Sequence, residues 1–366
     1  MHCVHLTSVH PRYDTRIFLK ECRSLARAGH HVTLVVADGK GDERKEGVRI
    51  IDVGVSCGRL RRMLGATRRV LAAARKLDAD VYHLHDPELL PAGVALSRMG
   101  KDVIFDAHED VGKQMLSKPY LNAPLRQCLA LGYNAYERSR IRRFAAVVTA
   151  TPAIAAKYAQ MHPRVLAINN YPMVDELHAG VNAGVKRAAL CYIGGICRIR
   201  GIVEVIRALN LTKHSVRLLL GGSFSDSEDE VRRMAGWTMV DQLGHIDRRR
   251  VQQVMSQAVA GLVTFHPEPN HLDAQPNKMF EYMSAGLPII ASNFSLWREI
   301  IEGNRCGICV DPLDPSAIAT AIDTLVSNPA LAQKYGENGR KAVVEQYNWA
   351  NEESKLVNLY RGLTRS

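Results

Sequence analysis

Residues 275–288 combine a helix start with groups that bind phosphates and sugar hydroxyls, so they are the clearest candidates for chemistry in this chain. Pro276 suits the first position of a helix, because that position needs no backbone N–H donor. Lys278 lies in the first turn, where free N–H groups also attract an anion such as a diphosphate. Glu281 follows one turn later, and its carboxylate can accept hydrogen bonds from the vicinal hydroxyls of a ribose. The segment predicts a nucleotide-sugar site, but an amphipathic helix with Lys and Glu on its solvent face has the same pattern.

Glycine-rich turns form a second group of candidates. Gly194 and Gly195 follow an apolar run and precede Arg198 and Arg200. Glycine lets a ligand approach the backbone closely, and arginine binds phosphate oxygens bidentately. The pattern favours phosphate binding, although an exposed basic turn is the alternative. A weaker signal of the same kind comes from Gly221, Gly222 and Ser223.

Histidines and carboxylates follow two strands expected in the first half, within residues 83–88 and 105–110. We expect them to point into a cleft at the strand ends, where His can position a hydroxyl or donate a proton. His and Asp are also suitable metal ligands. Neither segment has the His-x-x-x-His spacing of a helical zinc site, so substrate handling is favoured over metal binding. In the first loop, His10, Asp14 and Arg16 fit a functional role or a helix cap equally well.

Short apolar runs alternate with helical patterns along the first half of the chain. Strand, helix and strand between Val4 and Ala37 form a βαβ unit, which implies a parallel sheet covered by helices. Strands are expected at Val4–Thr7, Val32–Ala37, Val48–Val53, Val81–Leu84, Val103–Phe105 and Val147–Ala150, with a helix ending at Gly29 and helices near 60–77, 87–99, 121–143 and 152–160. This half is predicted to be a doubly wound α/β domain, residues 1–170.

The alternation restarts after a connector at residues 173–187. Strands are expected at Leu190–Ile193, Val216–Leu220, Met239–Leu243, Gly261–Phe265, Ile289–Ala291 and Ile308–Val310, and helices at 202–210, 227–235, 248–258, 276–285, 296–302, 315–327 and 330–345. We therefore predict a second Rossmann-like domain at residues 171–348. Ligands of such sheets collect beyond the carboxyl ends of the strands.

Composition limits the partners. A chain of 366 residues suggests two domains, and a net charge of +11 favours anionic ligands. Eight cysteines in this length indicate reduced thiols. The first residues lack a secretory signal, so a cytoplasmic protein is expected. Arginines and apolar residues at 59–76 predict a basic amphipathic helix that could rest on an anionic membrane, with a solvated basic face as the alternative. Nucleic acid is not expected as a partner, because aromatic residues are not interleaved there.

The chain resembles the retaining glycosyltransferases of family 4, which have the GT-B fold. The likeness spans nearly the whole chain and depends on the motifs at 192–201, 276–282 and 286–288. Residues 27–32, 106–109 and 348–349 are similar to parts of bacterial surface-polysaccharide members. The resemblance implies two Rossmann-like domains with parallel sheets facing each other across a cleft. It also implies an N-terminal domain that binds the acceptor, a C-terminal domain that binds the nucleotide sugar, and a last helix, 349–366, that crosses back to the first domain.

Matching positions imply roles for single residues. Glu281 matches the second Glu of the Glu-x7-Glu signature, which binds the ribose, and Asp273 stands at the first, which contacts the donor sugar. Arg200 matches the phosphate-binding Lys, and His108 matches a cleft His near the donor sugar and acceptor. Arg198 is taken as a substitute for an Arg that many members have at position 195. The expected donor-binding set is Gly194, Gly195, Arg198, Arg200, Gly222, Ser223, His245, Asn277, Lys278 and Glu281, and the expected catalytic set is His108, Arg200, Lys278 and Asp273.

The reaction that this resemblance implies is transfer of a sugar from a nucleoside diphosphate, UDP or GDP, to a hydroxyl of a glycan or lipid-linked acceptor. The anomeric configuration is retained, and no cofactor and no metal are expected. Cell-envelope polysaccharide synthesis at the inner face of the membrane is the expected setting. Two alternatives stay open at this point: a nucleotide-sugar 2-epimerase of the same architecture, and a non-catalytic basic protein that binds membranes or nucleic acid.

Overall fold

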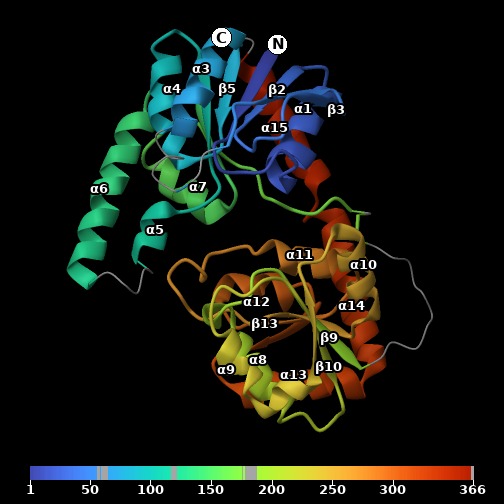
Figure 1. Ribbon diagram of the computed structural model, residues 1–366. Helices are drawn as coiled ribbons and strands as arrows, with labels where there is room; N and C mark the ends of the chain where they lie inside the picture. The colour runs from blue at the N-terminus through green and yellow to red at the C-terminus, as the bar shows by residue number, and fades with distance from the viewer. Residues whose placement is uncertain (56–57, 59–64, 117–121, 175, 178–187, 364–366) are drawn as a thin grey trace. The chain divides into compact units, whose positions relative to one another are not determined.

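Two β-sheets, one with mostly and one with wholly parallel strands, organise the chain (Figure 1). The computed structural model describes residues 1–55, 58, 65–116, 122–174, 176–177 and 188–363. It divides into two compact units, which we call unit 1 (Met1–Asn170 with Trp349–Ser366) and unit 2 (Tyr171–Asn348).

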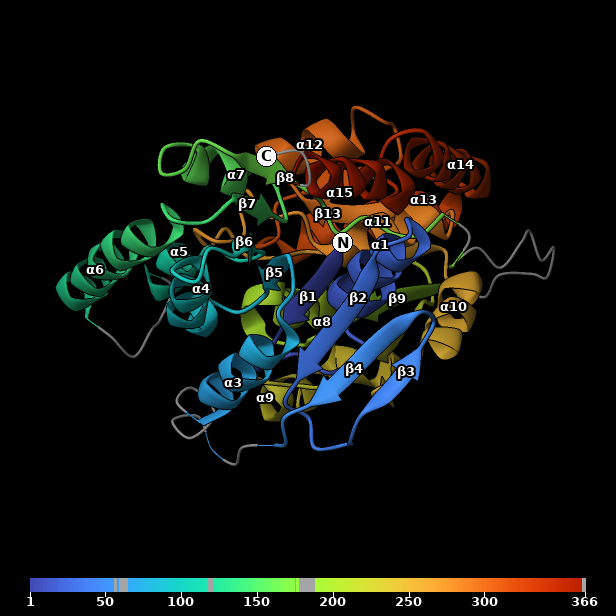
Figure 2. The same ribbon diagram turned by 90° about the horizontal axis from the view of Figure 1, so that it is seen from above.

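The sheet of unit 1 has the strand order β3-β4-β2-β1-β5-β6-β7-β8. Neighbouring strands are parallel except β3 and β4, and Figure 2 shows β2, β4 and β3 side by side. The strands are β1 (His2–Leu6), β2 (His31–Val36), β3 (Glu43–Lys45), β4 (Val48–Asp52), β5 (Val81–Leu84), β6 (Asp102–Ala107), β7 (Ala146–Thr149) and β8 (Val165–Ala167). The helices are η1 (Thr15–Cys22, with π-type hydrogen bonds), α1 (Arg23–Arg27), α3 (Thr67–Leu77), η3 (Pro87–Leu89), α4 (Leu90–Ser97), α5 (Val111–Leu116), α6 (Ala123–Ile141), α7 (Pro152–Ala159) and α15 (Trp349–Leu363).

The sheet of unit 2 is parallel throughout, with the order β11-β10-β9-β12-β13-β14. Its strands are β9 (Ala189–Ile193), β10 (Arg217–Gly221), β11 (Val240–Gly244), β12 (Ala260–Val263), β13 (Ile289–Ser292) and β14 (Gly307–Val310). Its helices are η4 (Arg198–Arg200), α8 (Ile202–Leu209), α9 (Glu228–Arg232), η5 (Ala235–Met239), α10 (Arg248–Gln257), α11 (Asn277–Ser284), α12 (Ser295–Ile301), α13 (Pro315–Ser327) and α14 (Pro329–Glu345).

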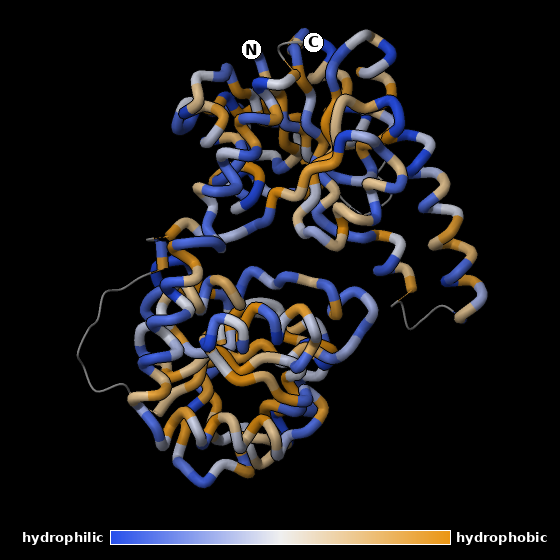
Figure 3. Tube along the Cα trace, turned by 180° about the vertical axis from the view of Figure 1, so that it is seen from behind, coloured by the Kyte–Doolittle hydropathy of each residue, from blue (hydrophilic) through white to orange (hydrophobic). Residues whose placement is uncertain are grey.

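Alternation along the strands builds one core on each face of the unit 2 sheet. Leu190 and Tyr192 of β9 pack with α8 and α13, whereas Cys191 and Ile193 pack with α10, α11, α12 and α14. Successive strand residues point to opposite faces, so a strand that is apolar throughout must be covered on both. Figure 3 shows hydrophobic segments of the trace gathered in the interior of each unit.

Some predicted elements differ from the structure. Pro276 has an extended ψ of 130° and is the residue before α11, which begins at Asn277. The helix expected near 87–99 is divided into η3 and α4, and Met239 belongs to η5 and not to a strand. Three elements of six residues or fewer, β3, β8 and α5, were not predicted from the sequence. Part of the expected basic helix, 59–64, and part of the connector, 175 and 178–187, lie outside the described residues.

Candidate functional site

The side chain of Lys278 is buried at the start of α11, with 8% of the residue exposed. Its Nζ lies 3.9 Å from the ring centroid of Tyr192 and 5.4 Å from that of Phe265. The aromatic faces attract the ammonium group, but Nζ has no hydrogen-bond partner in the described chain. The free N–H donors of this buried ammonium can therefore bind an anionic ligand.

Glycine is required where the loops after β9 and β10 meet beside Lys278. Gly194 has φ +115° and Gly222 has φ +142°, values that other residues rarely adopt. A Cβ on Gly222 would lie 1.9 Å from the carbonyl oxygen of Gly194, and one on Gly194 would lie 3.7 Å from Nζ of Lys278. The two turns therefore bring bare backbone next to the buried ammonium.

The two arginines after Gly195 have different surroundings. Arg200 donates from Nη1 to the carbonyl oxygen of Gly195 at 3.3 Å, and its guanidinium carbon lies 5.5 Å from the ring centroid of Phe265. Arg198 forms an ion pair with Glu230, and Asp226 accepts a hydrogen bond from its backbone N–H at 2.7 Å. Arg200 is thus the cation of this turn that shares an aromatic neighbour with Lys278.

Glu281 lies in α11 and accepts a hydrogen bond from Nη1 of Arg248 at 2.7 Å. Arg248 also donates to Glu176 at 2.5 Å. Arg248 was not predicted as a site residue, although Asp247 caps α10 directly before it and so fixes its place at the helix start. The ion pair orients the carboxylate that is predicted to bind the ribose.

The remaining predicted donor residues lie on the surface of unit 2. Asp273 is exposed in the loop before α11, and Asn277 is the exposed first residue of that helix. Ser223 and His245 are exposed after β10 and β11. All four follow the carboxyl end of a strand of this sheet, but direct contacts between them and Lys278 are not among those described. Their roles in binding stay predictions.

Donor binding is expected to tighten as pH falls from about 9 to about 7. Burial, followed by the charge of Arg200, lowers the pKa of Lys278 to about 7. A bound diphosphate would raise it again, so binding takes up a proton and affinity falls by up to ~10-fold per pH unit above the free pKa. Calorimetry with a nucleotide sugar measures this, because a free diphosphate itself titrates near ~6. Affinity that is independent of pH would contradict the role of Lys278, and a Lys278→Met variant serves as the flat reference.

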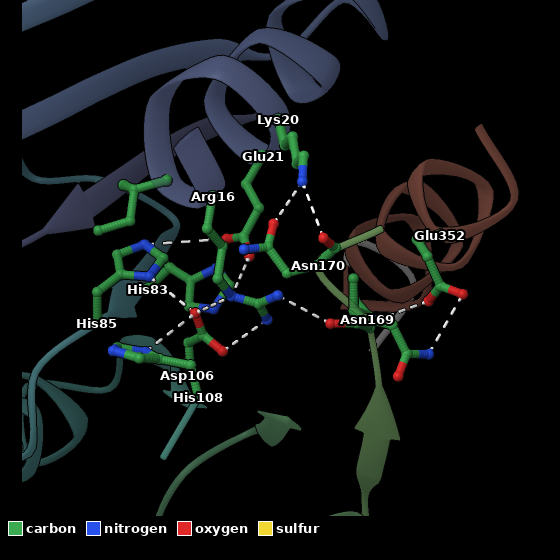
Figure 4. A network of polar contacts seen from close by, with 12 residues as sticks. Arg16, Lys20, Glu21, His83, His85, Asp106, His108, Asn169, Asn170 and Glu352 are labelled. Carbon is green, nitrogen blue, oxygen red and sulfur yellow. Dashed lines mark hydrogen bonds and ion pairs between the residues drawn. The ribbon is translucent and has the colours of Figure 1, made fainter. Parts of the chain in front are cut away.

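In unit 1, Arg16 and Asp106 form a buried bidentate ion pair (Figure 4). Nε and Nη2 of Arg16 lie 2.7 and 2.8 Å from the two carboxylate oxygens, and Nη1 donates to the carbonyl of Ile168 at 2.8 Å. Burial alone would raise the pKa of Asp106, but Arg16 and hydrogen bonds such as that from His85 hold it well below its usual value. The pair joins η1 to the end of β6.

His108 follows β6 and is partly exposed, with Nδ1 3.7 Å from Asp106. Its ring packs edge-on against that of His10 at a centroid distance of 5.2 Å. Nδ1 of His10 lies 3.4 Å from Oδ2 of Asp14, and Nε2 of His10 lies 3.4 Å from Oδ1 of Asp86. His108 is therefore held at the carboxyl end of the sheet, as predicted from its place after the strand.

The structure corrects the predicted placement of His83 and His85 and decides between the two roles predicted for Asp14. His83 and His85 are fully buried and do not point into an open cleft, because η1 and α15 cover this part of the sheet. Asp14 acts as a helix cap: its carboxylate accepts from the N–H groups of Arg16 and Ile17.

The basic helix predicted at residues 59–76 corresponds in part to α3, which begins at Thr67. α3 contains Val70 and Ala74 on its buried face, and Arg69 donates to the carbonyls of Val53 and Gly54. The predicted membrane contact involves residues 59–76, of which 59–64 lie outside the described residues, so this contact stays a prediction. Among the helices of the described ranges, none combines the length and apolar composition needed to cross a bilayer.

Two family comparisons together match most of the chain. Residues 15–170 match the Glycosyl transferase 4-like domain, and residues 187–328 match the Glycosyl transferases group 1 domain. The chain belongs to the family 4 glycosyltransferases. This family therefore accounts for both units, and the resemblance predicted from the motifs is confirmed.

Curated relatives of this chain have low sequence identity to it. Glycogen synthase of Mycobacterium tuberculosis is 21% identical over 385 residues, which cover 93% of this chain and 89% of that protein. The capsular polysaccharide biosynthesis glycosyltransferase CapM of Staphylococcus aureus is 24% identical over 189 residues, 49% of this chain and 47% of that protein. The chain spans about half the length of several other curated relatives that it matches.

Solved structures confirm the GT-B fold of the family 4 protein. Sucrose-phosphate synthase from Thermosynechococcus elongatus superposes with a TM-score of 0.78 at 19% identity, covering 100% of this chain and 99% of that one. HepE of Anabaena, in complex with UDP and glucose, gives a TM-score of 0.76 at 14% identity, covering 99% and 100%.

Proposed function

We propose that the chain is a retaining glycosyltransferase that moves a sugar from UDP or GDP to a hydroxyl of a glycan or lipid-linked acceptor. The observation that carries the proposal is the buried ammonium of Lys278, which has no hydrogen-bond partner among the described residues and lies beside the bare backbone of Gly194. Both residues belong to the unit that matches the group 1 domain. A diphosphate leaving group needs such fixed positive charge. Membership of the family supports the reaction class, and HepE, which was solved with UDP and glucose, supports a nucleoside-diphosphate donor.

The proposed chemistry needs no added metal. The bond from the anomeric carbon to the diphosphate oxygen breaks, and the acceptor oxygen forms its bond on the same face of the sugar. The acceptor proton passes to the departing diphosphate, whose charge Lys278 and Arg200 balance together with the first N–H groups of α11. Glu281 would hold the ribose, Asp273 the donor sugar, and His108 a hydroxyl near the reaction centre.

Two further features, the likeness to CapM and the net positive charge, support the proposed class of acceptor. The likeness to CapM favours a role in capsule or other envelope polysaccharide synthesis. A net charge of +11 favours an anionic acceptor or a location at an anionic membrane face. These two features guide the choice of acceptors for an assay.

The test is turnover of UDP-, GDP- and ADP-sugars with glycan and lipid-linked acceptors, in buffer that contains EDTA. We expect one nucleotide class to be consumed, with release of the free diphosphate and a product whose anomeric proton coupling equals that of the donor. An inverted product would refute retention, and activity that appears only with Mg²⁺ would refute charge balance by protein cations. A 2-epimerase would give no free diphosphate. Absence of donor binding for all three nucleotides would refute the whole proposal.

A further inference from the structure

Three histidines project from one face of two adjacent strands in unit 1. The parallel register places His5 of β1 beside His83 of β5, and His85 follows two residues later. Residues two apart on a strand point to the same side, and Glu21 of η1 covers this side. All four side chains are fully buried. Figure 4 shows Glu21 directed toward His83 and His85.

The donor atoms of these four residues converge on one point. Oε2 of Glu21 lies 3.9 Å from Nδ1 of His5, 3.8 Å from Nδ1 of His83 and 3.9 Å from Nε2 of His85. Nδ1 of His5 lies 2.8 Å from Nε2 of His85, and all four ligand atoms lie within 4.8 Å of one another. Bonds of ~2.0–2.1 Å in a tetrahedral zinc site put ligand atoms roughly 3.3 Å apart. The ligand atoms, now up to 4.8 Å apart, would therefore have to close by as much as roughly 1.5 Å to complete the coordination.

Unsatisfied groups point independently to a missing ligand. Both carboxylate oxygens of Glu21 are buried without a hydrogen-bond partner in the described chain. Nε of Arg16 lies 3.2 Å from Oε1 of Glu21 and offsets only part of its charge, because Arg16 is already engaged by Asp106. Leaving a buried carboxylate without hydrogen bonds is costly, and folded proteins rarely do so.

The surrounding contacts fix the imidazoles as metal ligands require. Nδ1 of His85 lies 3.1 Å from Asp106, so it donates to that carboxylate and leaves the lone pair on Nε2 toward His5 and Glu21. The hydroxyl of Tyr360 lies 3.3 Å from Nε2 of His5 and 2.9 Å from Nδ1 of His83. On metal binding, the Tyr360 hydroxyl would keep its contact with Nε2 of His5, and Nδ1 of His83 would exchange its contact with Tyr360 for the metal ion.

We propose that His5, Glu21, His83 and His85 form a structural zinc site in unit 1. Four protein ligands fill a tetrahedral shell and leave no open position, so the ion would stabilise the fold and take no part in sugar transfer. The site would join β1, β5 and η1. It goes beyond the proposed function and does not depend on it.

The test is elemental analysis of the untagged full-length chain, with about one zinc per chain expected. X-ray absorption at the zinc edge should show nitrogen and oxygen ligands at ~2.0 Å and no sulfur. Chain refolded with a chelator should melt at a lower temperature, and Zn²⁺ alone should restore the original value.

Variants separate this site from an adventitious one. His85→Ala and Glu21→Gln are expected to lower the zinc content at least tenfold, whereas His214→Ala, an exposed histidine of unit 2, should leave it unchanged. Should either variant fail to fold, absorption spectra of the Co²⁺-substituted native chain still report tetrahedral coordination. A native chain without zinc, with no thermal shift on adding Zn²⁺, would overturn the proposal and indicate a neutral network with a protonated Glu21.

Discussion

Replacing Lys278 by Met is expected to lower kcat by ~10²–10³-fold and, at the same time, to make the empty protein more stable. The ammonium is buried against the rings of Tyr192 and Phe265, and none of the described residues supplies it with a hydrogen-bond acceptor. A methionine fills a similar volume without charge. The same side chain thus costs stability in the free protein and supplies positive charge when the diphosphate departs.

The size and pH dependence of the stability gain follow from the pKa of Lys278. Burial lowers this pKa from 10.5 to about 7, so at pH 7 or below the folded protein bears the cost of a buried charge. We expect Lys278→Met to raise the free energy of unfolding by ~1–3 kcal/mol there. The gain should shrink between pH 7 and 10.5 and vanish above it, because the lysine is then neutral in both states.

The matched control is Lys341→Met, whose side chain is 71% exposed on α14. The same chemical change should leave both kcat and stability nearly unaltered. Chemical denaturation at several pH values and steady-state kinetics measure the two effects. A Lys278→Met variant that is less stable than the native chain, or fully active, would show that Lys278 belongs to the core and not to the donor site.

The donor-site elements were predictable because their physics is local. Glycines at positive φ, an arginine after a short turn, and Met279, Phe280 and Met283 at helical spacing specify the turn and the helix without long-range information. The error at Pro276 concerns only one residue: extended ψ is as compatible with proline as helical ψ, and the helix begins at Asn277.

The environment of Lys278 and of the histidines was not predictable in the same way. A lysine in the first turn of an amphipathic helix is usually exposed, and its burial depends on Tyr192 and Phe265, which are remote in sequence. His83 and His85 were expected in a cleft because they end a strand. They are buried because η1 and α15, far apart in sequence, pack on that strand. The short elements β3, β8 and α5 were missed because so few residues show no clear periodicity.

Removing residues 349–366 is expected to unfold unit 1 and to leave unit 2 folded. α15 buries six apolar or aromatic side chains in unit 1: Trp349, Leu356, Val357, Leu359, Tyr360 and Leu363. At ~1.5–3 kcal/mol for each buried side chain, their loss amounts to roughly 10 kcal/mol, which is as large as the whole stability of many domains. The deletion would also remove buried Glu352, which accepts a hydrogen bond from the N–H of Asn169 at 2.9 Å.

Hydrogen exchange with mass spectrometry distinguishes the two units. Amides of β1 and β5 should lose protection in the shortened chain, whereas those of β9 and β12 should keep it, since no described residue of 349–366 belongs to unit 2. The control is Ser354→Ala in the intact chain, because Ser354 is exposed and its hydroxyl donates to the carbonyl of Ala350 in the same helix. Equal protection of β1 in the shortened and intact chains would mean that α15 contributes little to unit 1. Loss of protection in β9 as well would mean that the two units unfold together, so that the helix stabilises the whole chain and not unit 1 alone.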